Sequence, residues 1–253
     1  GDVDVLFHVG AVVPGPDYPS NISRQKIFDV NVRSCLCLGE WTLQRRIPIV
    51  FLSGATVYAD PRKNHIVETD PYSACGLGGF YGASKLFAEQ IFQHLIAEGL
   101  HAIIFRPSSI YGYGLSPKKM IGRFLTLADQ NETIELKPPA DDRINLIHAA
   151  DVADAMITAA SQSARGTFNI SGPALCSIVD IAETCVRTVG RGRVRVLPEP
   201  ATRPSQNLFD LSYEAAARAF GFFPKIDLRH GIERMWRDMI DSLNISLTNK
   251  DPR

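Results

Sequence analysis

The feature that most constrains the fold is the alternation of short apolar runs with longer segments of helical periodicity. Residues 4–10, 48–53 and 102–106 have the length and apolar content of buried strands. Between them, residues 23–45 and 81–98 carry apolar side chains at a spacing near that of an α-helix. This order predicts an α/β fold in which a doubly wound parallel sheet is covered by helices on both faces.

The pattern is looser in the second half of the chain. Residues 117–130 and 151–161 have helical periodicity, and residues 166–172 resemble a short strand that ends in a turn. A smaller second lobe, interleaved in sequence with the first, is therefore expected.

Composition excludes several functional classes. The 253 residues include 27 Lys+Arg and 27 Asp+Glu, so the formal net charge of zero provides no field for nucleic acid or an anionic membrane. The longest apolar stretches are strand-sized. The five cysteines form no C-x-x-C pair, so reduced thiols are expected in place of metal ligands. No export signal is recognisable, and we expect a cytoplasmic enzyme without a metal.

Tyr81 and Lys85 are the residues that indicate chemistry. Four residues apart at the start of a predicted helix, they lie one above the other on a single face. At about 4 Å and an effective dielectric near 20, an ammonium stabilises a phenolate by roughly 4 kcal/mol, or about three pKa units. The phenol pKa would then fall to about 7, where it serves as general acid and base. The alternative is a solvated pair without function.

Other segments stand in the order of one family's motifs. They are Phe7–Ala11, Asn31–Ser34, Leu52–Tyr58, Arg106–Gly112, Arg143–Val152, Phe168–Gly172, Arg203–Pro204 and Ala219–Lys225. With Tyr81 and Lys85, they make the chain resemble the extended short-chain dehydrogenase/reductase family, in its nucleotide-sugar epimerase/dehydratase branch that includes UDP-glucose 4-epimerases.

The resemblance implies a Rossmann-type fold and an NAD cofactor, with NADP left open. Residues 1–113 would be the remainder of the dinucleotide-binding domain. Residues 114–253 would be mainly a substrate-binding lobe, from which about 144–165 return to the first domain. The family's first strands and Gly-rich pyrophosphate turn do not occur in this sequence. We therefore expect a longer parent polypeptide, which an intact mass of 27.9 kDa for the expressed protein would refute.

One glycine stretch matches a dinucleotide fingerprint by letters alone. Gly76, Gly79 and Gly82 have the spacing G-x-x-G-x-x-G, but no hydrophobic strand precedes them. A loop without contact to pyrophosphate is the favoured interpretation.

The resemblance also implies roles for individual residues. Tyr81 would take a proton from a sugar hydroxyl, and Lys85 would hold the cofactor ribose. Arg143 and Arg203 would clamp the diphosphate of a nucleotide sugar, with surface salt bridges as the alternative, and Ser109 would contact the substrate. The cofactor-binding set implied in this way is His8, Ala11, Asn31, Ser53, Tyr81, Lys85 and Pro107.

The sequence departs from the family at two of these positions. Gly54 stands where the family has its catalytic Ser or Thr, which leaves Ser53 and Thr56 as equal candidates for that hydroxyl. Ser109 stands where the family usually has Asn, and this change puts the expected substrate contact in doubt.

The segment after residue 53 also separates reactions. Sugar-nucleotide dehydratases carry two acidic residues where this chain has Ala55 and Thr56, and elimination of water needs an acid and a base. An NAD-dependent nucleotide-sugar epimerase is therefore favoured over a dehydratase. An NAD(P)-dependent sugar-nucleotide or carbonyl reductase remains open, as does a non-catalytic relative with a binding or regulatory role. The resemblance further implies a homodimer through helices 23–45 and 81–98.

Overall fold

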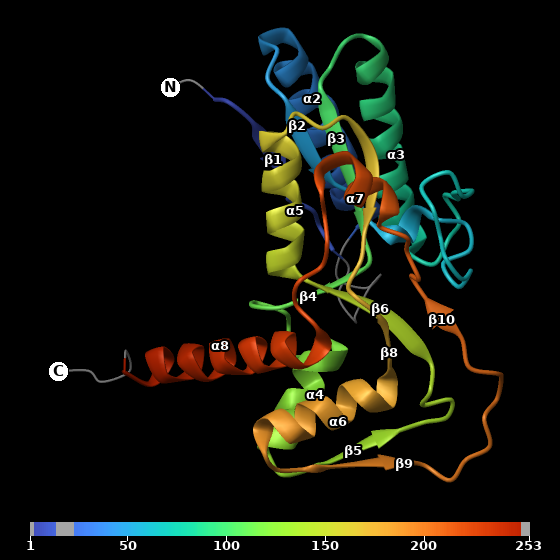
Figure 1. Ribbon diagram of the computed structural model, residues 1–253, viewed down its shortest axis with the longest axis vertical. Coiled ribbons are helices and arrows are strands. Elements are labelled where there is room, and N and C mark those ends of the chain that lie inside the picture. Colours follow the sequence, from blue (N-terminus) through green and yellow to red (C-terminus); the bar gives the residue numbers. More distant parts are fainter. Residues whose placement is uncertain (1–2, 14–22, 249–253) are drawn as a thin grey trace. The chain divides into compact units, whose positions relative to one another are not determined.

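The computed structural model describes residues 3–13 and 23–248, without the side chains of residues 242–248. By their internal packing the residues form two compact units (Figure 1). The first unit comprises residues 1–108, 152–171 and 209–223, and the second comprises residues 109–151, 172–208 and 224–253. The functional domain bounds 1–113 and 114–253 expected above stay a prediction.

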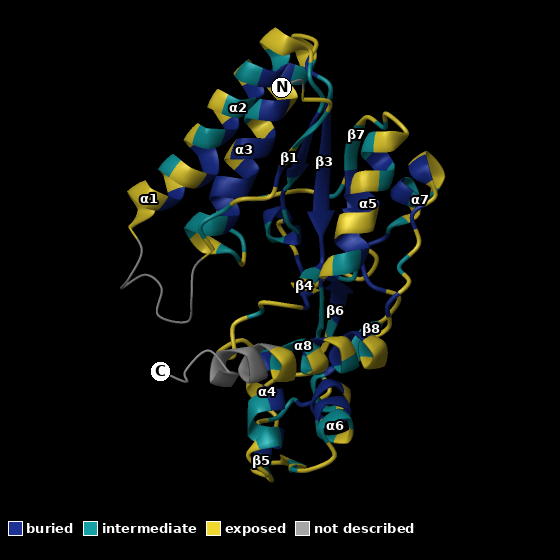
Figure 2. Ribbon diagram, turned by 90° about the vertical axis from the view of Figure 1, so that its left-hand side faces the viewer, coloured by how far each residue is buried: buried dark blue, intermediate teal, exposed yellow. Residues whose placement is uncertain are grey.

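The first unit is built on a parallel sheet of four strands in the order β1-β2-β3-β7. Every residue of β3 is buried, as expected for a strand covered on both faces. Figure 2 shows α2 and α3 on one side of this sheet and α5 on the other. The elements are β1 (Leu6–His8), α1 (Arg24–Phe28), η1 (Asp29–Arg33), α2 (Ser34–Arg45), β2 (Ile49–Leu52), η2 (Ala55–Val57), α3 (Gly79–Ala97), β3 (Ala102–Pro107), α5 (Ala149–Ser161), β7 (Gly166–Ile170) and α7 (Glu214–Phe220).

The predicted α/β fold is confirmed, and one part of its core lies between the sheet and the helices α2 and α3. Phe51 and Ile104 from β2 and β3 pack with Phe92 and Leu95 from α3 and with Cys35 from α2. The sequence of the helices explains the contact, because these apolar side chains recur on one face of each helix.

Two elements differ in detail from the sequence predictions. The buried strand predicted over residues 4–10 is a three-residue strand at the sheet edge, and Phe7 and Val9 are 43% and 55% exposed. It is not buried throughout because, among the described strands, only β2 pairs with it. The helix predicted over residues 23–45 is three consecutive segments, with a π-helical turn in the middle.

The second unit contains a small mixed sheet, a separate strand pair and three helices. β6 lies between β10 and β4 and also pairs antiparallel with β8, while β5 pairs with β9. Ile121, Leu125, Ile181 and Ile232 join α4, α6 and α8 in one core. The elements are β4 (Ser109–Tyr111), α4 (Met120–Asp129), β5 (Thr133–Leu136), β6 (Arg143–His148), β8 (Leu175–Ser177), α6 (Ile178–Val189), β9 (Arg193–Val196), β10 (Asn207–Leu208) and α8 (Leu228–Thr248).

Candidate active site

The candidate site lies in the first unit, at the edge formed by the carboxyl ends of β1, β2 and β3. Ligands of open parallel sheets bind outside this edge. The first turns of α3 reach it, because Lys85 Nζ donates a 2.8 Å hydrogen bond to the carbonyl oxygen of Leu52, the last residue of β2. The site therefore combines strand ends with the start of one helix.

Tyr81 and Lys85 lie on the same face of α3, as their spacing predicts. Lys85 Nζ is 6.0 Å from the centroid of the Tyr81 ring, and its side chain is only 3% exposed in a position over the Phe51 ring. Ser84 fixes the turn between them, because its hydroxyl donates to the Tyr81 carbonyl and accepts from the Asn31 amide. The two side chains thus share a helix face as expected, while the catalytic roles stay a prediction.

The expected pKa of the phenol is not met. Burial raises the pKa of Tyr81 above its ordinary value. Burial also lowers the pKa of Lys85 to about 8, although the nearby Cys35 and Glu89 act in the opposite direction. The prediction of a phenol near neutrality is wrong for the free protein, because burial removes the water that would stabilise the phenolate.

The three positions that could carry a hydroxyl after β2 differ sharply. The Ser53 hydroxyl donates a 2.5 Å hydrogen bond to the Glu89 carboxylate. Thr56 Oγ1 is buried and has no hydrogen-bond partner among the described residues. Gly54 has an extended backbone with φ 179°, and a Cβ atom there would meet, among the described residues, only Thr56 Oγ1, at 3.6 Å.

The glycine stretch before α3 packs against this same turn. A Cβ on Gly78 would lie 2.9 Å from the Cβ of Thr56, and one on Gly82 would lie 3.0 Å from the Thr56 carbonyl oxygen. Gly79 has φ +52°, a conformation that glycine adopts without strain. Gly78 and Gly82 therefore allow the start of α3 to approach Thr56 closely. The favoured interpretation of the stretch as a loop without contact to pyrophosphate stays a prediction.

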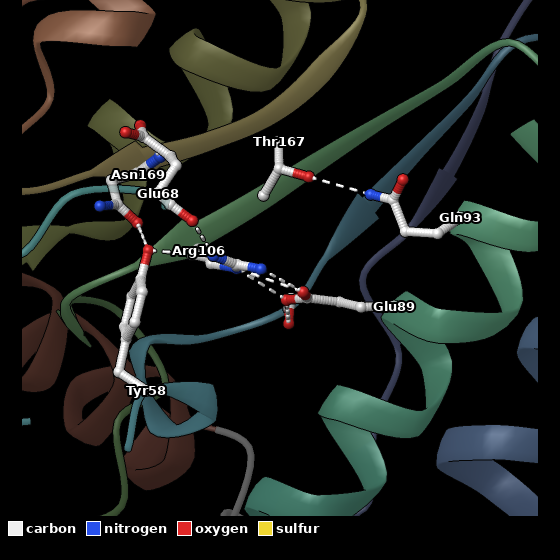
Figure 3. Close-up of polar contacts among 8 residues, drawn as sticks. Tyr58, Glu68, Glu89, Gln93, Arg106, Thr167 and Asn169 are labelled. Carbon is white, nitrogen blue, oxygen red and sulfur yellow. Dashed lines mark hydrogen bonds and ion pairs between the residues drawn. The ribbon is translucent and has the colours of Figure 1, made fainter. Parts of the chain in front are cut away.

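The Glu89 carboxylate, which accepts from Ser53, also forms a buried ion pair with Arg106 (Figure 3). The Arg106 guanidinium donates to both oxygens of the Glu89 carboxylate, with a shortest distance of 2.7 Å. Its other terminal nitrogen donates to the Tyr58 hydroxyl at 3.1 Å, and Tyr58 donates in turn to Asn169 at 2.6 Å. The network thus joins α3, β3 and β7 to the segment after β2.

Sequence reasoning missed Glu89, Tyr58 and Asn169 as parts of this network. A signal was present for Glu89, because an acidic residue four positions after Lys85 continues the buried face of α3. The partner of Glu89 comes from β3, so spacing along the helix does not reveal it.

The residues expected around a cofactor lie at the end of β1 and beside it. Asn31 holds the chain after β1 through two hydrogen bonds to the backbone of Val12. His8 contacts the Cys35 thiol at 3.2 Å, and burial lowers the pKa of the His8 imidazole. Ala11 is half-buried after β1, and Pro107 is the last residue of β3.

The residues expected to bind substrate lie in the second unit. Ser109 is the half-buried first residue of β4, and Arg143 is the exposed first residue of β6. The Arg203 guanidinium makes two hydrogen bonds, of 2.9 and 2.5 Å, to the Asp142 carboxylate. Asp142 precedes Arg143 in the chain, so both arginines lie at the start of β6. The salt bridge kept as an alternative for Arg203 is present.

A metal-binding cluster and a membrane-spanning helix are both absent from residues 3–13 and 23–248. No group of three or more His, Cys, Asp or Glu side chains is arranged to hold a metal ion. None of the helices there combines the length and apolar character needed to cross a bilayer.

Comparison with known proteins gives a family match. A family model described as "NAD dependent epimerase/dehydratase family" matches residues 1–171. UDP-glucuronic acid decarboxylase 3 from Arabidopsis thaliana is 24% identical over 96% of this chain and 72% of its own length. A dTDP-4-dehydro-6-deoxy-D-allose reductase from Streptomyces is 27% identical over 93% of this chain and 74% of its own length.

Solved structures share the fold. The structure titled MoeE5 in complex with UDP-glucose and NAD superimposes with a TM-score of 0.78 over 95% of this chain and 80% of that chain. Its sequence identity is 23%, so this likeness supports the α/β fold alone.

Proposed function

Because the chain belongs to the NAD-dependent epimerase/dehydratase family, we propose that it is an NAD-dependent epimerase of a nucleotide sugar. Its relatives carry the names of several reactions, among them a decarboxylase, a reductase and a dehydratase. The choice among them therefore depends on the residues of this chain.

One observation carries the choice of an epimerase. The half-buried Tyr81 and the buried Lys85 share one face of α3 at the strand edge, and no carboxylate occurs in the turn from Ser53 to Val57. The buried Glu89 carboxylate is already hydrogen-bonded to Arg106 and Ser53. Reversible oxidation of an alcohol needs one acid-base group, whereas elimination of water needs a further pair.

The described residues fit the nicotinamide half of the cofactor. Lys85 uses one N–H on Leu52 and retains donors for a ribose hydroxyl. The loop after β1 leaves open space, because a Cβ on Gly10 would meet no described atom within 4 Å. When bound there, NAD supplies the acceptor and later the donor of a hydride.

The chain's own residues would orient the sugar and move one proton. Tyr81 Oη would take the proton from the sugar hydroxyl during oxidation and return it to the keto oxygen during reduction. Lys85 would stabilise the phenolate between these two steps. Arg143 and Arg203 would hold the diphosphate, which requires Arg203 to share or exchange its contact with Asp142.

A second candidate function is reduction of a keto sugar with NAD(P)H. The raised pKa of Tyr81 favours it, because a protonated phenol is the form that donates to a developing alkoxide. A reductase would release oxidised cofactor after every turnover, whereas an epimerase would retain it.

The two functions are tested on the same protein preparation. Cofactor released by denaturation is identified by mass, and UDP-, GDP- and dTDP-hexoses are then incubated with the protein, with and without NADH or NADPH. An epimer formed without added cofactor supports the proposal. Conversion of a keto sugar only with stoichiometric consumption of reduced cofactor refutes it in favour of the reductase.

We also propose a homodimer through residues 23–45 and 81–98. Phe28, Leu36 and Phe87 in these helices are about two-fifths exposed, at 41%, 41% and 39%. Burial of these apolar side chains between two copies of the chain would stabilise a dimer. Light scattering after size-exclusion chromatography measures the mass of the protein in solution. A monomer at micromolar concentration would contradict the proposal.

A further inference from the structure

We propose that Thr56 supplies the hydroxyl that hydrogen-bonds the reacting oxygen of the sugar, in place of the residue-54 hydroxyl that this chain lacks. The inference rests on the proposed function and deepens it, because it assigns a substrate contact that the sequence left divided between Ser53 and Thr56. Three observations in the first unit support the assignment.

Ser53 is already committed to another partner. Its hydroxyl donates to Glu89, and the side chain is 5% exposed. The Glu89 carboxylate also accepts from Arg106, so this bond belongs to the buried ion-pair network. A hydroxyl has a single proton to donate, and Ser53 has no second one for a sugar oxygen.

Thr56 has the opposite character. Its Oγ1 atom is buried without a hydrogen-bond partner among the described residues, and such a group is destabilising unless a ligand or water satisfies it. Oγ1 is 3.6 Å from the position that a Cβ on Gly54 would occupy. The Thr56 hydroxyl therefore borders the space that a residue-54 side chain would fill.

Gly78 and Gly82, at the start of α3, hold Thr56 close to the helix that carries Tyr81. The Cβ positions of Gly78 and Gly82 are within 3.0 Å of Thr56 atoms, so any larger residue at either position would displace the turn. Gly82 directly follows Tyr81 in the chain. The small size of Gly78 and Gly82 thus lets Thr56 pack against the start of α3.

The test compares variants that add or remove one hydroxyl. Thr56→Val removes the hydroxyl at nearly constant shape, and Thr56→Ser keeps it. Gly54→Ser is compatible with the backbone, because φ is extended and the nearest described atom is at an ordinary contact distance. Thr158→Val, on α5, is the matched control for a threonine substitution.

We expect Thr56→Val to lower kcat about a hundredfold, in line with loss of one transition-state hydrogen bond. Thr56→Ser should retain most of the activity. Adding Gly54→Ser to Thr56→Val should recover about tenfold, since a serine there restores a hydroxyl in the same space. Ser53→Ala should lower the melting temperature, because it removes a hydrogen bond to the buried Glu89 carboxylate.

Substrate binding provides a readout that does not require turnover. By calorimetry, Thr56→Val should weaken binding of UDP-glucose about tenfold while leaving the affinity for UDP unchanged. If the parent protein binds the sugar nucleotide without converting it, the proposed function fails, and this comparison still decides the role of Thr56. Full activity of Thr56→Val, equal weakening of UDP and UDP-glucose, or absence of nucleotide-sugar binding by the parent would each overturn the inference.

Discussion

Substitution of Arg106 tests the physical basis of the site most sharply. The Glu89 carboxylate is 1% exposed. In Arg106→Met it would lose three hydrogen bonds, which leaves the Ser53 hydroxyl as its described donor. Breaking a buried pair by removing one partner costs about 3–5 kcal/mol, because the remaining charge is uncompensated. The loss is a large fraction of a typical total stability of about 5–15 kcal/mol.

Urea unfolding followed by tryptophan fluorescence measures this loss. Trp41 lies in the first unit and Trp236 in the second, so a Trp236→Phe background confines the signal to the unit that contains Arg106. Arg218→Met on α7 removes an exposed ion pair with Glu214 and serves as the control, which should leave the midpoint unchanged.

The double variant Glu89→Leu with Arg106→Met separates charge from packing. Replacement of both partners removes the isolated charge, so the double variant should be more stable than Arg106→Met alone. A loss below about 1 kcal/mol for Arg106→Met, or a double variant that loses the sum of both single losses, would refute the role given to the ion pair.

Three further outcomes are expected. Tyr81→Phe should lower kcat at least about a hundredfold with an unchanged urea midpoint, as expected for a general acid-base group. Steady-state kinetics of the identified reaction measures this, and a normal kcat would contradict it. The folded-state pKa of Lys85 is depressed to about 8, so this lysine binds more protons in the unfolded chain above that pH, and the stability of the parent relative to Lys85→Met should rise from about pH 8 to 10. The buried thiols of Cys35 and Cys185, whose pKa values are raised, lower the stability of both proteins in this range, so unfolding at several pH values is compared between the two, and a constant difference would contradict the expectation. Gly78→Ala should reduce both stability and kcat, because its Cβ would lie 2.9 Å from that of Thr56, and a fully active variant with the parent's melting temperature would contradict the close packing.

The general architecture could be predicted from the sequence because local patterns determine it. The buried strand over residues 102–107 and the long helix ending before Gly99 are both encoded by runs of adjacent residues. The same locality explains the stacking of Tyr81 and Lys85, since their separation is one turn of a helix.

The remaining features depend on contacts between distant residues. The raised pKa of Tyr81 comes from burial, which depends on the neighbouring elements and not on the four-residue spacing. The choice between Ser53 and Thr56 depends on Glu89, which is 36 residues away from Ser53. Spacing along the chain could identify the two hydroxyls but could not tell which was already hydrogen-bonded.

The proposed epimerase chemistry is tested most directly by the fate of the hydrogen on the reacting sugar carbon. A nucleotide hexose converted by the protein is prepared with deuterium at that carbon and incubated with the enzyme. Hydride removal and return by a retained cofactor predicts an epimer that keeps the deuterium, formed at least about a hundredfold more slowly with Tyr81→Phe. An epimer that has exchanged its deuterium for solvent hydrogen would contradict the account.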